Sequence, residues 1–293
     1  KPRKDEQWIA SIYVDAVKRL TANEKLQEEV NEINKKLDEG KDKELNKLWK
    51  ETRKLSLDAF EIIYKELNTK FDHYYFEGEV EEQGKKIAQD LVKKGIAEIS
   101  EGATIVNLEE QKLGVSVILR GDGTILYPGK DLYLAKEKFK EYKLDKSLYI
   151  VADEQNLHLK QVFKILELDK FKQSDKLKHV AFGMVRLPHG KMSSRTGDNI
   201  LYSDFKQELL EIAKKSIKQK WPKLSSKELE TRALKITIAA MKYPMLSQDP
   251  NKTITFDKTQ AMKFEGETGP YIQYTYARAT SILKKSNKQP KLT

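Results

Sequence analysis

The chain has 293 residues, of which 39% are hydrophobic and 34% are charged, so it is long enough to form two domains, or one large domain, around a real core. Its 55 lysines and arginines against 45 aspartates and glutamates leave a formal charge of +10, which suits a polyanionic partner. The absence of cysteine excludes a disulfide framework and a thiolate metal site, and the four histidines lack metal-ligand spacing, so we expect no protein metal site.

Every apolar run is too short to span a bilayer, and residues 1–5 are followed by no signal-type apolar core. We therefore expect a soluble, cytoplasmic protein that makes no contact with a membrane.

The first third of the chain is predicted to be almost entirely helical. Apolar residues recur every three or four positions over 8–67, with a break at Gly40, and again over 80–94 until Gly95. Plain amphipathic packing helices are the simplest interpretation of this pattern.

After Gly95 the apolar period shifts towards two, which predicts short strands at 96–99, 103–106 and 115–119. A hairpin turn is expected at 120–124, because its Asp-Gly pair tolerates the positive φ that such turns need. A helix is then expected from Leu126 to Tyr142.

Two continuous apolar runs predict buried strands of a parallel sheet. Residues 148–152 form the first run and lead into a helix over 157–168, and residues 179–187 form the second. Ligands of open α/β sheets bind outside the carboxyl ends of the strands. The loop after residue 187 is therefore expected to meet a nucleotide.

The rest of the chain is predicted to be mostly helical. A capping-box pattern at Ser225 and Glu228 begins one of these helices. The expected elements are helices at 202–218, 225–245 and 271–285 and a short extended piece at 253–256.

The loop at 189–198 carries residues that suit phosphate binding. Lys191 offers a point charge, Ser193 and Ser194 offer hydroxyl donors, and two glycines let the backbone approach a ligand. Composition alone fits a solvated turn better. The tetrad Lys-Met-Ser-Ser favours the functional interpretation, because an exposed turn has little need for methionine.

This loop resembles the KMSKS signature of class I aminoacyl-tRNA synthetases, which binds the ATP triphosphate and stabilises the charge that develops as pyrophosphate leaves. The resemblance implies catalytic roles for Lys191, Ser193 and Ser194, and ATP binding by Lys191 and Met192. The signature's usual second lysine is Ser194 here, with Arg195 next to it.

Three further stretches resemble arginyl-tRNA synthetases in particular. They read D-G-T-I-L-Y-P-G-K-D at 122–131, Y-I-V-A-D-E-Q-N-L-H at 149–158, and F-E-G-E-T-G-P-Y-I-Q-Y at 264–274 followed by Arg278. Four matches in the same order over residues 120–280 are not explained by chance.

The resemblance implies an arginine-tRNA ligase, which uses ATP with Mg²⁺ to form arginyl-adenylate and transfers arginine to the 3′ end of tRNA(Arg). Tyr127, Asp131 and Gln155 are then expected to bind arginine. Independently, the planar guanidinium suits a carboxylate such as Asp131, although alone this residue also suits the start of a helix. Tyr127 and Asp131 share a helix face if the helix has begun at Tyr127.

The resemblance also implies contacts with ATP and tRNA. Gly183 and Met184 are expected to meet the adenine through backbone groups, and His158 to lie at the ATP site, although a buried methionine or a lone histidine is more often structural. Four residues of the last predicted helix either face tRNA, where aromatic and guanidinium groups stack on unpaired bases, or form a bundle core: Tyr271, Gln273, Tyr274 and Arg278.

The expected fold is α/β, comprising the second half of a class I synthetase Rossmann-type nucleotide-binding domain with a large, mostly helical insertion and a C-terminal helical region. We expect the insertion at 1–119, the nucleotide-binding half with its loop at 120–218, and the stem-contact region with the start of the anticodon-binding helices at 219–293. A monomer is expected.

The H-x-G-H signature of class I synthetases occurs nowhere in the sequence. We therefore expect a fragment that catalyses neither step well by itself. Two alternatives remain at this point. Another class I synthetase, such as a cysteinyl, glutamyl or lysyl member, would share the loop without the Tyr127, Asp131 and Gln155 set, and a non-catalytic relative would bind tRNA only.

Overall fold

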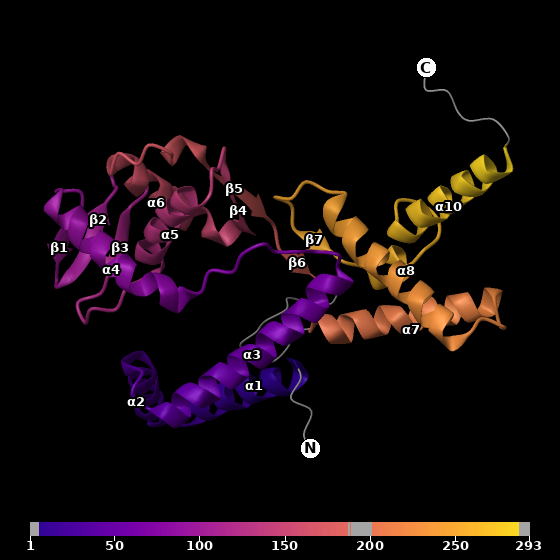
Figure 1. The fold of residues 1–293 in the computed structure, drawn as a ribbon, viewed down its shortest axis with the longest axis horizontal. Helices are drawn as coiled ribbons and strands as arrows, with labels where there is room; N and C mark the ends of the chain where they lie inside the picture. The colour runs from indigo at the N-terminus through magenta and orange to yellow at the C-terminus, as the bar shows by residue number, and fades with distance from the viewer. Residues whose placement is uncertain (1–5, 187, 189–200, 287–293) are drawn as a thin grey trace. The chain divides into compact units, whose positions relative to one another are not determined.

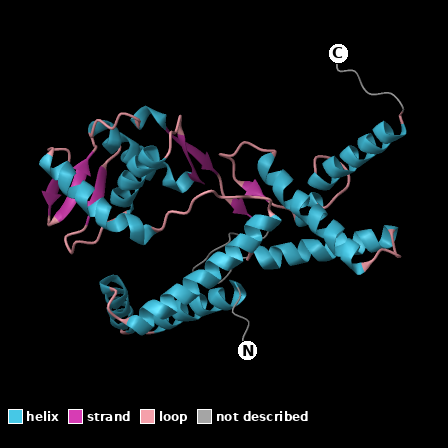
Figure 2. Ribbon diagram, viewed as in Figure 1, coloured by secondary structure: helices cyan, strands magenta, loops and turns pink. Residues whose placement is uncertain are grey.

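The computed structural model describes residues 6–186, 188 and 201–286. Contacts within the chain define two compact units, which are described separately: unit 1 comprises residues 1–71, 186–248 and 255–293, and unit 2 comprises residues 72–185 and 249–254. Figures 1 and 2 show the elements of both units.

Unit 2 combines helices with two small sheets. Its elements are α4 (Glu77–Lys93), β1 (Glu98–Ser100), β2 (Ala103–Asn107), β3 (Val115–Leu119), α5 (Tyr127–Glu141), β4 (Ser147–Ala152), α6 (Asn156–Leu168) and β5 (Leu177–Phe182), with short 3-10 turns at Asp153–Gln155 and Ser174–Lys176. Strands β1, β2 and β3 form an antiparallel sheet, and β4 pairs with β5 in parallel. The parallel pairing confirms the prediction from the two apolar runs.

The core of unit 2 lies between α4, α5, α6 and the antiparallel sheet. Ile118, Leu132, Ile165 and Leu166 are almost completely buried in it. These positions follow the period of their helix or strand, so burial of one apolar face per element organises this unit.

Helices α4 and α5 approach each other closely. A Cβ added at Gly84 would lie 3.0 Å from the carbonyl oxygen of Gly129, so a larger residue at Gly84 would push α4 and α5 apart. Lys130 also forms an ion pair with Glu77 at 2.7 Å. These contacts fix where α5 begins.

A buried carboxylate at the end of α6 links that helix to the end of α4 and to the middle of α5. Asp169 follows α6, its side chain is only 4% exposed, and it accepts hydrogen bonds from Lys94 at 2.7 Å and from Lys136. Burial raises the pKa of Asp169, but the bonds from the two lysines outweigh burial and hold the pKa below its ordinary value.

Unit 1 is mainly helical. Its helices are α1 (Glu6–Ala22), α2 (Leu26–Glu39), α3 (Lys43–Glu66), α7 (Tyr202–Lys220), α8 (Ser226–Leu246), α9 (Lys258–Ala261) and α10 (Gly269–Lys285), and the chain also holds the two-stranded sheet of β6 (Val185–Arg186) and β7 (Ile254–Thr255). Glu66 accepts hydrogen bonds from Tyr202 and Lys206, which join α3 to α7. A Cβ at Gly269 would lie 2.0 Å from the carbonyl oxygen of Ala239, so α10 begins directly against α8.

The predicted helix ends at Gly40 and Gly95 are confirmed, and both glycines have positive φ.

One predicted strand is wrong. The sequence predicts a single strand over 179–187, whereas β5 ends at Phe182 and β6 begins at Val185. Gly183 lies between them, and its N–H donates to the Pro250 carbonyl at 2.6 Å.

Burial of β4 also differs from the expectation. Leu148 and Ile150 are 54% and 66% exposed, whereas the apolar run predicts a strand buried on both faces. On the opposite face Tyr149 packs against Phe163 of α6, with ring centres 5.2 Å apart. Among the described residues, helical cover on β4 is therefore found on one face only.

The expected domain boundaries and the compact units divide the chain differently. The boundary at 119/120 falls within unit 2, and the one at 218/219 falls within unit 1. The expected domains remain a prediction.

None of the described helices has both the length and the apolar character of a bilayer-spanning segment. The described residues also contain no group of three or more side chains suited to hold a metal ion.

We expect Leu166→Ala to destabilise unit 2 by about 2–5 kcal/mol, because it removes a fully buried side chain and leaves a cavity. Leu157→Ala is the matched control, since Leu157 lies in the same helix and is 54% exposed. Native-state hydrogen exchange of the α5 amides measures the free energy of unfolding of this core. Equal losses in both variants would contradict the assigned core.

Candidate functional site

The start of α5 presents two of the predicted arginine-binding residues. The turn before the helix has the predicted form: Gly123 has a φ of 83°, and the Asp122 carboxylate accepts the Thr124 N–H at 2.8 Å. Helix α5 begins at Tyr127. Tyr127 and Asp131 are therefore one helical turn apart on the same face, which meets the condition set by the sequence.

Asp131 is bound to a second predicted site residue, His158. The Oδ2 atom of Asp131 lies 2.6 Å from Nε2 of His158, and the two side chains are 30% and 21% exposed, respectively. His158 lies in the first turn of α6, which follows β4. The contact joins residues 27 positions apart in the sequence, so spacing along one helix did not reveal it.

Two more polar side chains surround this pair. The Lys138 ammonium lies 4.3 Å from the ring centre of Tyr149. Burial lowers the pKa of Lys138, and the negative charge of Asp131 opposes that shift. Burial also raises the pKa of Tyr149 to about 12, with a smaller rise from the charge of Asp131. We call Asp131, Lys138, Tyr149 and His158 the Asp131 cluster.

Sequence reasoning missed Lys138 as part of this cluster. It lies seven residues after Asp131, a spacing that returns to the same helix face, so the signal was present in the sequence. The other two predicted arginine-binding residues lie at the surface: Tyr127 is 69% exposed, and Gln155 is exposed at the end of the 3-10 turn before α6. Their contact with a ligand remains a prediction.

The predicted adenine-binding residues lie where β5 ends. Besides the Gly183 bond to Pro250, the Met184 carbonyl accepts the Ile254 N–H at 2.9 Å. A Cβ at Gly183 would lie 2.5 Å from the Lys252 carbonyl group, so only glycine fits here. Met184 is 41% exposed. Two of the backbone groups expected to read the adenine thus already have partners within the chain, and the adenine contact remains a prediction.

The predicted phosphate-binding loop lies outside the described residues. Lys191, Met192, Ser193 and Ser194 all fall within 189–200. Their expected roles remain predictions.

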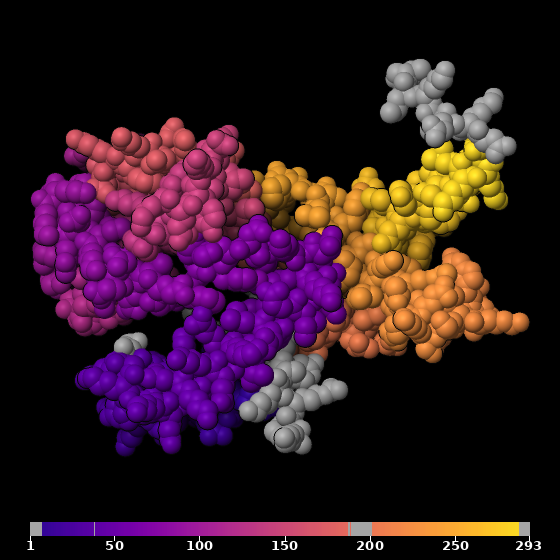
Figure 3. All heavy atoms as spheres, in the orientation of Figure 1, coloured from indigo at the N-terminus to yellow at the C-terminus, as the bar shows by residue number. Residues whose placement is uncertain are grey.

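The four predicted tRNA-binding residues lie on α10, and all are exposed. The Tyr271 and Tyr274 rings are stacked with centres 6.5 Å apart, and Arg278 donates a hydrogen bond to the Tyr274 hydroxyl at 3.2 Å. Gln273 donates to the carbonyl of Lys235 in α8 at 3.1 Å. In the space-filling view, one face of α10 (yellow) is not covered by other residues (Figure 3). These residues thus lie at the surface of the described chain rather than in a core.

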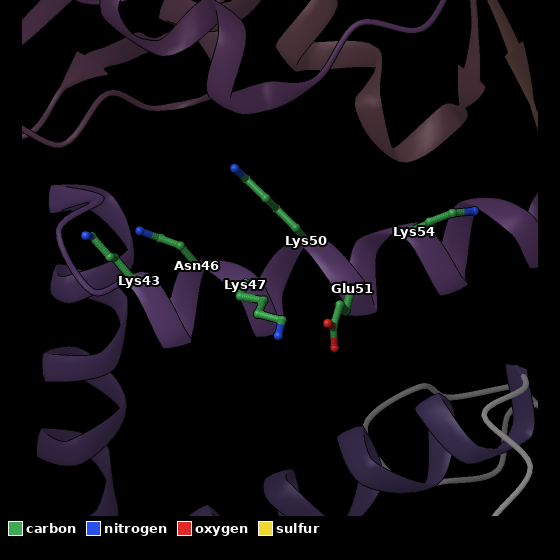
Figure 4. Close-up of a pocket in the computed structure, with 6 residues that line it drawn as sticks. All are labelled: Lys43, Asn46, Lys47, Lys50, Glu51 and Lys54. Carbon is green, nitrogen blue, oxygen red and sulfur yellow. The ribbon is translucent and has the colours of Figure 1, made fainter.

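A basic groove on α3 was not singled out from the sequence. This open groove of about 560 Å³ is lined by one helix, and four of its six lining residues are lysines (Figure 4): Lys43, Asn46, Lys47, Lys50, Glu51 and Lys54. The lysines are spaced four, three and four residues apart and therefore form one stripe along the helix. Such a stripe attracts phosphate groups.

The sequence of this chain matches a known protein family. The family model for "tRNA synthetases class I (R), catalytic domain" matches residues 3–257. The arginine-tRNA ligase of Clostridium kluyveri is 38% identical over 278 residues, which cover 95% of this chain and 49% of that protein. The corresponding Clostridium acetobutylicum protein is 37% identical over 277 residues, or 94% of this chain and 49% of that protein. The chain thus spans about half the length of the curated relatives it matches.

Solved structures have the same fold. The arginyl-tRNA synthetase of Thermus thermophilus matches with a TM-score of 0.75 at 23% identity, over 93% of this chain and 52% of that one. The Plasmodium falciparum arginyl-tRNA synthetase also matches with a TM-score of 0.75, at 20% identity, over 92% of this chain and 46% of that one. These matches confirm the predicted α/β fold class.

We expect the Tyr149 phenol to stay protonated until the pH approaches 12, because burial raises its pKa to about 12. A raised pKa means that folding favours the protonated phenol, so this contribution to stability is complete below pH ~10 and disappears as the pH rises further. Tyrosine ¹³Cζ NMR measures the titration, with Tyr149→Phe to assign the resonance. Titration at the ordinary value would contradict the assigned burial.

Proposed function

Because the chain belongs to the family of class I (R) tRNA synthetase catalytic domains, we propose that it forms the arginine-binding part of an arginine-tRNA ligase. The family match is to the arginine branch, which argues against the cysteinyl, glutamyl and lysyl alternatives. The enzyme activates arginine with ATP and transfers the arginyl group to the 3′ end of tRNA(Arg). It acts as a monomer in the cytoplasm.

The observation that carries this proposal is the placement of Asp131. The carboxylate is only partly exposed, lies one turn into α5, and shares a helix face with the exposed ring of Tyr127. A guanidinium is planar and permanently charged, so a carboxylate pairs with it and a flat ring stacks on it. Gln155, next to α6, supplies an amide for a further hydrogen bond.

The ATP contacts of the proposed enzyme lie at and after the end of β5. Lys191, Met192, Ser193 and Ser194 contact the triphosphate, where a fixed cation and hydroxyl donors stabilise the charge of departing pyrophosphate. Mg²⁺ accompanies the phosphates of ATP rather than a protein metal site. Gly183 and Met184 lie beside the adenine, and His158 lies near the nucleotide. Catalysis consists mostly of positioning and charge stabilisation.

The tRNA contacts lie on α10. Exposed tyrosine rings and a guanidinium suit stacking on unpaired bases, and this helix presents Tyr271, Gln273, Tyr274 and Arg278. The lysine stripe on α3 and the net charge of +10 favour the same polyanionic partner. In the proposed enzyme, residues 1–119 are the insertion, 120–218 the nucleotide-binding half, and 219–293 the stem-contact region with the first anticodon-binding helix.

We expect Asp131→Asn to weaken arginine binding by about 30-fold, because loss of the charged hydrogen bond costs about 2 kcal/mol. Isothermal titration calorimetry of this chain with arginine measures the affinity. Asp175→Asn is the control, since Asp175 is an exposed aspartate of the same unit. Equal affinity in the two variants would count against Asp131 as the guanidinium partner.

We expect this chain by itself to give no arginine-dependent ATP–pyrophosphate exchange, even with tRNA and Mg²⁺ present, because the sequence lacks the H-x-G-H signature. The assay compares the chain with Lys191→Ala. Exchange that disappears in Lys191→Ala would show that another segment replaces this signature. Binding of tRNA without any binding of arginine or ATP would favour the non-catalytic relative.

A further inference from the structure

We propose that His158 is a positioning residue that holds the Asp131 carboxylate in the orientation that receives the arginine guanidinium. The inference rests on the proposed function and deepens it, because it assigns a task to a side chain that the resemblance places only near ATP. The contact that carries it is the 2.6 Å distance between His158 Nε2 and Asp131 Oδ2.

The geometry of the pair suits this task. Asp131 belongs to α5 and His158 to α6, so the imidazole holds the carboxylate from a neighbouring helix rather than from its own. A carboxylate on an exposed helix face rotates freely, and a short charged hydrogen bond removes that freedom before the ligand arrives. Affinity then rises because the ligand does not have to order the side chain itself.

The bond leaves the carboxylate able to bind a ligand. A carboxylate has about four lone-pair positions on its two oxygens, and His158 occupies one position on Oδ2. Oδ1 and the second position on Oδ2 still match the fork of a guanidinium. His158 therefore sets the direction of the carboxylate without competing for the substrate.

The surroundings of the pair include a competing partner for Asp131, so the orientation of the carboxylate has to be held. Lys138 of α5 is a cation close enough to feel the charge of Asp131, and its ammonium lies over the Tyr149 ring of β4. An Asp131 side chain that swung towards Lys138 would form an internal ion pair in place of one with the substrate. The bond to His158 opposes this competing arrangement.

The test measures arginine affinity by calorimetry in four proteins: wild type, His158→Leu, Asp131→Asn and the double variant. We expect His158→Leu to weaken binding about tenfold, and to have no further effect once Asp131 is already asparagine. This non-additivity is the signature of a residue that acts through its partner. A merely structural histidine would weaken both backgrounds equally, and that result would overturn the inference.

A second variant guards against misfolding. His158→Gln places an amide N–H near the position of Nε2, so we expect it to restore arginine affinity to within about threefold of wild type. His73→Leu is the matched control, because His73 lies in the same unit outside the Asp131 cluster, and we expect unchanged affinity. Failure of His158→Gln to recover affinity, with native hydrogen exchange in α5 and α6, would overturn the inference.

An NMR measurement separates this inference from the proposed function. We expect arginine to shift the ¹⁵Nε2 resonance of His158 in wild type and not in Asp131→Asn. Binding that is weaker in Asp131→Asn but unchanged in His158→Leu would overturn the inference alone. The absence of arginine binding by wild type would overturn the proposed function, and the inference with it.

Discussion

The close approach of α4 and α5 is the constraint on which the candidate site depends. A Cβ added at Gly84 of α4 would lie 3.0 Å from the backbone carbonyl oxygen of Gly129 in α5, and the Lys130–Glu77 ion pair holds the same end of α5. The contact determines where the first turn of α5 lies, and that turn carries Tyr127 and leads to Asp131. The contact between the two helix backbones thus positions the charged side chain of Asp131, because backbones in direct contact can shift very little relative to each other.

Most of the fold could be predicted because its signals are local. The end of α2 at Gly40 follows from one residue that tolerates positive φ, and the parallel pairing of β4 with β5 follows from two apolar runs that flank a helix. The interruption at Gly183 could not be predicted, because it depends on residues 250–253 passing close to the backbone. That contact has no signature in the residues around Gly183 itself.

The candidate site likewise has a part that the sequence predicts and a part that it does not. The shared face of Tyr127 and Asp131 follows from their spacing, and Lys138 continues that face. The spacing of residues within one helix therefore predicts this part of the site. His158 belongs to the next helix, and its contact with Asp131 depends on how α5 packs against α6. Resemblance named His158 as a residue of interest but assigned it to the nucleotide, because a motif records which residues recur and not which atoms they touch.

The segment that borders Gly183 also has a consequence for the order of folding. The Pro250 carbonyl that receives the Gly183 N–H lies about 70 residues further along the chain, beyond α7 and α8. During synthesis on a ribosome, β4 and β5 can pair as soon as they emerge, whereas the end of β5 gains this partner only after α8 has been made. Strand β6, which precedes the Lys-Met-Ser-Ser loop, likewise gains its partner β7 only after α8, so the chain around Gly183 is completed late.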